Sequence, residues 1–284
     1  MTQVAETKDA ADTFLDHHGT IQALPETAIQ LIHLFRDPNC SAAQLLKVVQ
    51  QDAALSAKIM KTVNSAYYSL ETKITNLQRA MAYMGVKTVK QVTLASSMTQ
   101  GRKPVIIGEF STADLWDHSL AVAVFARELA VRTRGADPED AFLAGMLHDV
   151  GLLFEAQLEP KTCEGIFSGA AAGQDSLIDL EEASFKFNHC HLGEKISIRW
   201  RFPEDVMCVT RWHHSPELSP PEHQAICRLI YVADHSCCTA GVGFALTCPK
   251  DPIPDDILAA VNVTRESLDE LIAKLPILLR LHRN

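Results

Sequence analysis

Histidine and aspartate side chains recur along the second half of this chain, usually beside apolar helical sequence. Imidazole nitrogens and carboxylate oxygens are ligands that iron, manganese, zinc and magnesium take in proteins. Because an unpaired polar group among buried apolar residues is costly, we expect these side chains to face one another or a cation. The candidate ligands are Asp114, His118, His148, Asp149, His189, His213, His214 and Asp234.

The spacing of these residues decides which of them share an ion. Asp114 and His118 are four residues apart, so on a helix they lie on one face, although an isolated pair of this kind is more often an exposed surface pair. His148 and Asp149 end the apolar run AFLAGML and diverge by about 100° around a helix axis. Both reach one dinuclear centre if the Asp149 carboxylate bridges two ions. Asp149 is therefore the preferred bridge and the candidate catalytic residue.

Other histidines and the cysteines bear on the kind of metal. Adjacent His213 and His214 could point to two neighbouring ions, although such a pair in a loop is more often exposed. His191, His223 and His235 are expected to be surface or packed residues without a role. The eight cysteines contain no C-x2-C pair, and several lie in apolar helical patterns, where cysteine behaves as a small hydrophobe. The predicted ligand set then holds no sulfur, which favours iron or manganese and leaves zinc and magnesium open.

Composition excludes several classes of protein. The net charge of −9 and the pI near 5.7 argue against a nucleic-acid-binding surface, which is usually basic. The N-terminus lacks the apolar region of a signal peptide. No apolar run is predicted to reach the roughly 20 residues that span a bilayer. We therefore expect a cytoplasmic protein that contacts neither membrane nor nucleic acid.

Helical periodicity dominates the chain, and no long alternating strand pattern occurs, so the predicted fold class is all-α. We expect a flexible or peripheral segment over 1–20, a helical half over 21–110, a metal-binding helical half over 111–245 and a helical tail over 246–284. Individual helices are predicted over 25–37, after a Ser41 cap, over 88–98, over 138–147 and after Thr264, ending near Pro276. Residues 160–180 are predicted to form a loop or a short helix.

From Trp116 to Asp234 the chain resembles the HD superfamily of metal-dependent phosphohydrolases, whose ligand order H…HD…D matches His118, His148–Asp149 and Asp234. From about Leu24 it resembles the HDOD family, a regulatory branch of that superfamily. The segments that carry this second resemblance are LPETAIQLIHL, QDAALSAKIMKTVNSAYY, ITNLQRAMAYMG, LWDHS, FLAGMLHDVG, the run from His189 through Gly193 to Pro203, and WHHSP. Together they cover roughly 210 residues in the family's order.

The resemblance implies an HDOD-type multi-helical fold with a metal site in an HD-like C-terminal bundle. This chain keeps the ligand positions of the related HD-GYP phosphodiesterases, with Asp114 where some of them have glutamate. It departs from them at Leu152, where their HDxGK motif has a lysine, and after His214, where their GYP loop is absent. Cyclic-di-GMP hydrolysis is therefore expected to be weak or absent, and Leu152→Lys is expected to raise any residual rate.

Three functions are compatible with these patterns. The favoured one is a bacterial signal-transduction regulator of the HDOD type that binds metal and contacts signalling proteins in trans. The alternative is an active metal-dependent phosphohydrolase or phosphodiesterase that acts on a nucleotide or cyclic dinucleotide, with two ions clamping the phosphate. The third is a helical domain with a purely structural metal. The sequence leaves the oligomeric state open.

Overall fold

A computed structural model describes residues 9–18, 30, 34, 41–64, 70, 72–89, 92–93, 104–249 and 251–283. Within these residues helices dominate, and the sheet that they contain is one short antiparallel hairpin. The fold is all-α, as the periodicity predicted. The helices predicted over 25–37 and 88–98 lie almost wholly outside the described residues.

The elements follow one another with short connections through the second half of the chain. In chain order they are α1 (Ala10–His18), α3 (Ala42–Gln50), α4 (Ala53–Val63), α5 (Leu77–Met84), β1 (Ile106–Ile107), β2 (Phe110–Ser111), α7 (Thr112–Thr133), α8 (Pro138–Leu147), α9 (Val150–Leu158), α10 (Pro160–Ala171), α11 (Leu177–Phe185), α12 (His189–Arg199), α13 (Glu204–Trp212), the short 3-10 helices η3 (Pro216–Leu218) and η4 (Pro221–His223), α14 (Gln224–Thr239), α15 (Asp255–Ala260) and α16 (Arg265–Arg283).

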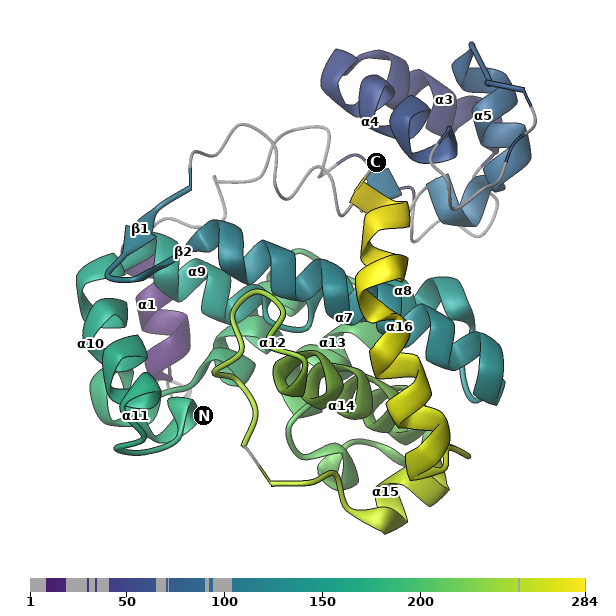
Figure 1. The fold of residues 1–284 in the computed structure, drawn as a ribbon. Helices are drawn as coiled ribbons and strands as arrows, with labels where there is room; N and C mark the ends of the chain where they lie inside the picture. Colours follow the sequence, from purple (N-terminus) through teal and green to yellow (C-terminus); the bar gives the residue numbers. More distant parts are fainter. Residues whose placement is uncertain are drawn as a thin grey trace, which may run out of the picture.

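Helices α3, α4 and α5 share an apolar core of their own. Helix α3 begins where predicted, because Ser41 and Gln44 form a capping box. The Gln44 N–H donates to Ser41 Oγ at 3.3 Å, and the Ser41 N–H donates to Gln44 Oε1 at 2.8 Å. Leu45, Ile59 and Val63 are fully buried in this core. In Figure 1 these helices lie apart from the larger bundle.

Helix α7 lies at the centre of the larger bundle, which contains the candidate ligands. Residues 121–126, with the sequence AVAVFA, are almost fully buried. Their mostly small side chains allow close contact with neighbouring helices. Helices α8, α14 and α16 all pack against α7, which runs across the bundle in Figure 1.

In this bundle the structure decides one open alternative and corrects one predicted helix end. Residues 160–171 form a regular helix, α10, because Cys163, Ile166 and Phe167 supply a buried stripe at helical spacing. Helix α16 does not end near Pro276 but continues to Arg283. A proline inside a helix removes one backbone hydrogen bond. The buried residues Leu271, Leu275 and Leu279 hold the helix on the core on both sides of it.

The segment before residue 20 contributes a packed helix. Helix α1 places Ala11 and Leu15 in the core of the larger bundle, where they are 2% and 1% exposed. Its outer edge faces α12, where the Arg199 guanidinium donates to Asp12 Oδ1 at 2.9 Å. Helix α1 is thus peripheral in position but is held by apolar burial as well as by charge.

One apolar stretch is longer than the sequence suggested. Residues Pro138–Leu158 are long and apolar enough to cross a membrane, but 83% of the most apolar window is buried inside the protein. The stretch is also broken between α8 and α9, at His148 and Asp149. Burial and the break are typical of two helices in a protein core.

Candidate metal centre

Seven of the eight predicted ligands converge in the interior of the larger bundle. They come from five parts of the fold: the middle of α7, the break between α8 and α9, the start of α12, the end of α13 and the second half of α14. Six of them are at most 3% exposed, and His214 is half-buried. The converging residues are His118, His148, Asp149, His189, His213, His214 and Asp234.

A close contact between α9 and α12 brings Asp149 beside His189. A Cβ atom on Gly151 would lie 1.9 Å from the His189 carbonyl oxygen and 2.7 Å from the Gly193 nitrogen. Only glycine at 151 therefore permits this crossing. The HDxG segment thus places a ligand at the start of α9 and supplies the gap that lets α12 approach it.

Four of the imidazoles are held in the same way, through Nδ1. A carbonyl oxygen can only accept a hydrogen bond, so a ring that bonds a carbonyl through Nδ1 carries a proton there and leaves Nε2 as the atom that faces the centre. Partners of this type orient metal-binding histidines in proteins. The four Nδ1 partners are the Val242 oxygen for His118 at 3.2 Å, the Gly145 oxygen for His148 at 2.7 Å, the Val209 oxygen for His213 at 2.9 Å, and Glu181 Oε2 for His189 at 2.7 Å.

The Asp149 carboxylate lies at the centre of the inward-facing Nε2 atoms. Its Oδ2 is 3.2 Å from His148 Nε2, and its Oδ1 is 3.3 Å from His213 Nε2 and 3.7 Å from His189 Nε2. Both oxygens, and the Nε2 atoms of His148 and His213, are buried without a hydrogen-bond partner. Buried polar atoms are rarely left unpaired. This donor set fits a divalent cation, and the two oxygens face different histidines, as a bridging carboxylate would.

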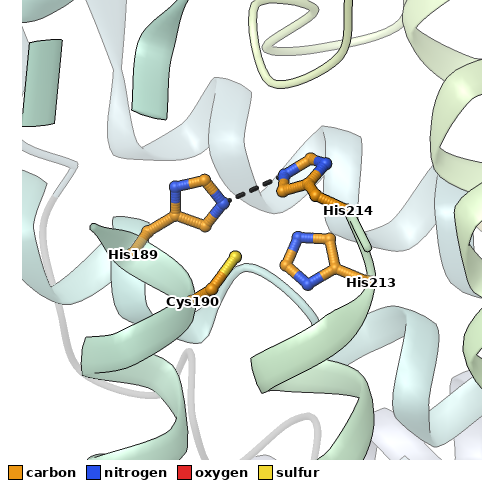
Figure 2. A group of neighbouring side chains, drawn as sticks. All are labelled: His189, Cys190, His213 and His214. Atoms are coloured by element: carbon orange, nitrogen blue, oxygen red, sulfur yellow. Dashed lines mark hydrogen bonds between the residues drawn. The ribbon is translucent and has the colours of Figure 1, made fainter. Parts of the chain in front are cut away.

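His214 faces His189 at the less buried side of the centre. Their Nε2 atoms are 3.1 Å apart, and Figure 2 shows the two rings directed toward each other, with His213 beside them. Burial, followed by the neighbouring His213 and His189, holds the pKa of His214 well below its usual range. A neutral His214 retains a lone pair for a cation.

Asp234 approaches the centre from α14 and pairs with His118. His118 Nε2 lies 2.9 Å from Asp234 Oδ1. Burial alone would lower the pKa of His118, but the hydrogen bond to Asp234 and its charge outweigh burial and raise the pKa to about 10. His148 Nε2 lies 3.9 Å from the same carboxylate oxygen. Asp234 therefore links His118 to the part of the centre around Asp149.

Asp114 is the predicted ligand that the structure does not bring to the others. Its Oδ2 accepts hydrogen bonds from the Ser111 N–H at 2.7 Å and the Ser111 hydroxyl at 2.8 Å. These bonds form a capping box at the start of α7. The carboxylate is one helical turn before His118 and is engaged with the helix end.

Sequence reasoning missed two carboxylates and three thiols around the centre. Glu181 on α11 bonds both the backbone and the ring of His189. Glu155 lies nearby and is fully buried, and burial, followed by the Glu181 charge, raises its pKa well above its usual range. Cys190, Cys238 and Cys248 have sulfur atoms within reach of the histidine and aspartate ligands. The prediction that the ligand set holds no sulfur was taken from cysteine spacing alone, and it stays a prediction with three thiols now placed beside the candidate ligands.

Leu152 does not face the centre. It is fully buried in an apolar cluster with Leu115, Phe167 and Phe244. A lysine there would carry its charge into the core. Leu152→Lys is therefore expected to destabilise the protein and not to provide a phosphate contact.

Comparison with known protein families identifies the family of this chain. The sequence profile of the HDOD domain matches residues 21–216. The chain belongs to the HDOD family. Its sequence is 22% identical over 230 residues to an uncharacterised protein of Treponema pallidum and 29% identical over 135 residues to the cyclic di-GMP phosphodiesterase CdgJ of Vibrio cholerae. These matches cover 81% and 46% of this chain but only 44% and 29% of the two relatives, which are longer proteins.

Solved structures share the fold over nearly the whole chain. An HDOD domain protein of unknown function from Geobacter sulfurreducens superposes with a TM-score of 0.79 and 23% identity, covering 96% of this chain and 95% of its own. A candidate phosphohydrolase from Shewanella amazonensis superposes with a TM-score of 0.71 and 19% identity, covering 93% and 94%. At these identities the likeness shows the HDOD fold and does not carry an activity.

Proposed function

We infer that this chain is a signal-transduction regulator of the HDOD type that holds divalent metal in its C-terminal bundle and acts through contacts with signalling proteins. The observation that carries this inference is the cluster of buried donor atoms without partners around Asp149. Five parts of the fold meet there. Because metal binding and folding are coupled at such a site, a cation would fix the relative positions of these parts. A partner protein could then bind selectively to the metal-bound conformation of the bundle.

The arrangement around Asp149 supports a dinuclear centre. One carboxylate oxygen faces His148 and the other faces His213 and His189. Nitrogen and oxygen donors of this kind suit iron or manganese, with zinc and magnesium as alternatives. A bound cation there would act as a Lewis acid and lower the pKa of coordinated water.

Burial of the centre favours regulation over catalysis. Six of the seven converging residues are at most 3% exposed, so a substrate would have to enter beside His214. The position of the lysine in related phosphodiesterases is occupied by Leu152, which lies in the apolar core. Catalysis needs the phosphodiester held in line with the attacking water as well as an activated water.

A phosphodiesterase acting on a cyclic dinucleotide is the second candidate. Its support is the similarity to CdgJ over 135 residues, together with the intact histidine and aspartate cluster. In this reading Asp149 would be the catalytic carboxylate, and a phosphate-containing nucleotide would be the ligand.

Metal content and turnover, measured on the same preparation, separate these functions. Protein purified without chelator should hold roughly one to two metal equivalents per chain, with no detectable hydrolysis of cyclic-di-GMP or of a generic phosphodiester. Asp149→Asn should remove most of the metal, whereas the matched variant Asp256→Asn, at an exposed residue of α15, should retain it. Robust hydrolysis that depends on Asp149 would replace the regulatory function with the enzymatic one, and failure to bind metal would overturn the centre.

A further inference from the structure

Two cysteine thiols lie against the carboxylate of Asp234. The Cys238 thiol donates to Asp234 Oδ1 at 3.6 Å, and the Cys248 thiol donates to Asp234 Oδ2 at 3.0 Å. His118 Nε2 also contacts this carboxylate, at 2.9 Å from Oδ1. We refer to Asp234, His118, Cys238 and Cys248 as the Asp234 end of the centre.

The fold holds these thiols in place through one helix and one tight turn. Cys238 follows Asp234 by four residues on α14, so both lie on the same face. The chain then reverses through Gly241 and Gly243, which have φ angles of +64° and +67°. A Cβ on Gly243 would lie 2.5 Å from the His118 nitrogen. The turn therefore packs directly against α7. The segment that follows it runs back toward Asp234 and brings Cys248 to the carboxylate.

Two groups of three donor atoms, which share Asp234, are each spaced closely enough to hold an ion. The ligand atoms of His118, Asp234 and Cys238 lie within 4.8 Å of one another, as do those of His214, Asp234 and Cys248. Ligands around a tetrahedral zinc ion, at bond lengths of about 2.0–2.3 Å, are separated by roughly 3.3–3.8 Å. Because both thiols contact the Asp234 carboxylate, an ion bound to Asp234 would have both sulfur atoms beside it. Two thiols, an imidazole and a carboxylate form a donor set that suits zinc and disfavours magnesium or manganese.

We propose that the Asp234 end is a zinc site in which Cys238 and Cys248 are ligands together with Asp234 and His118. This assignment rests on the proposed metal centre and adds two sulfur ligands to it. When zinc binds, each thiol and His118 Nε2 release a proton to water, and bonds to zinc replace the hydrogen bonds that these groups donate to Asp234. The Asp234 end is then selective for zinc, while the donors around Asp149 contain only nitrogen and oxygen.

Cobalt binding reports sulfur ligation directly. The full-length protein is stripped with chelator, kept reduced and titrated with Co²⁺, and the sulfur-to-cobalt charge-transfer band in the near ultraviolet is recorded. The wild type should show the band and lose it on adding Zn²⁺ but not on adding an equal amount of Mn²⁺. Cys238→Ser and Cys248→Ser should each lose about half of the band and at least about tenfold in zinc affinity. The double variant should show no band.

Serine variants separate ligation from simple hydrogen bonding. A serine hydroxyl still donates to Asp234, so a purely hydrogen-bonding role predicts unchanged cobalt and zinc binding. Cys208→Ser, at a half-buried position on α13 outside the ligand groups, should leave the band unchanged. A band that disappears in Cys190→Ser and survives in the double variant would overturn the assignment.

The wild-type protein provides a second measurement in case a variant folds poorly. The ¹¹³Cd spectrum of the cadmium-loaded protein should contain a resonance shifted downfield by sulfur ligands. Normal metal content without a charge-transfer band or such a resonance would overturn the zinc site and leave the proposed metal centre standing. Absence of any metal binding would overturn both.

Discussion

At the scale of single residues, the orientation of the imidazoles decides what the centre can bind. Three of the four anchored rings bond backbone carbonyls, but His189 bonds the carboxylate of Glu181 through Nδ1 at 2.7 Å. Glu181 also accepts the backbone N–H of His189 at 3.0 Å, and it is fully buried. A carboxylate partner fixes both the tautomer and the ring plane of a ligating histidine and increases its basicity. Glu181 is therefore a positioning residue for His189.

Removing this carboxylate should weaken metal binding without removing a ligand. Glu181→Ala is expected to lower metal affinity about 10–100-fold, because His189 is then free to rotate and to change tautomer. Glu181→Gln should lose less, since its amide oxygen can still accept the Nδ1 proton. Competition with a chromophoric chelator measures both. The exposed neighbour Glu182 bonds Asn188 instead, so Glu182→Ala should bind metal normally; equal losses in Glu181→Ala and Glu182→Ala would contradict the role.

At the scale of secondary-structure elements, the crossing of two helices brings two of the candidate ligands together. Helices α9 and α12 approach so closely at Gly151 that a methyl group would collide with the backbone of His189. Asp149 begins α9 and His189 begins α12. The distance between Asp149 and His189 thus depends on Gly151, which has no side chain and is not itself a ligand.

Adding a methyl group at this crossing should separate the ligands. Gly151→Ala is expected to destabilise the protein by about 3 kcal/mol or more, because backbone atoms cannot move aside as flexible side chains do, and to reduce metal binding. Gly165 provides a matched control on α10, since its Cβ would meet nothing within 4 Å. Gly165→Ala should stabilise its helix by about 0.5–1 kcal/mol. Urea denaturation gives both values, and similar effects at the two sites would refute the packing argument.

At the scale of the whole molecule, the described residues form separate apolar cores. One contains α3, α4 and α5, and the others lie in the larger bundle with the metal centre. Among the described residues, Lys87 connects the two regions through ion pairs with Asp137 at 3.0 Å and Asp140 at 2.7 Å. All three side chains are more than a third exposed, and exposed ion pairs contribute little to stability. We expect the two regions to unfold as separate units.

Calorimetry should then show two thermal unfolding transitions, and metal binding should raise the Tm of only one of them. At a Mn²⁺ or Zn²⁺ concentration of about 100 times the dissociation constant, the bundle should gain about 2.7 kcal/mol, which raises its Tm by about 5–10 °C. The transition of the N-terminal helices should not move. Asp149→Asn should abolish the shift in the bundle. A single transition that moves as a whole with metal would show that the two regions unfold together.

The sequence by itself determined the fold class, the HDOD family pattern and seven of the residues that meet at the centre. Helical periodicity and residue type are local properties, so they can be recognised before any contact is known. The break at Asn188, which caps α12, and the start of α8 at Pro138 follow from local chemistry in the same way. The ligand role of each converging residue stays a prediction until metal binding is measured.

Only the tertiary structure decided which side chains surround these residues. Glu181 and Cys248 reach the centre through a neighbouring helix and a reversed turn, and neither has a spacing that marks it as a partner. Asp114 has the right spacing from His118, but its carboxylate caps α7. Leu152 follows the HDxG motif and yet points into the apolar core. Contacts between separate elements depend on how the helices pack, and one sequence pattern is compatible with several packings.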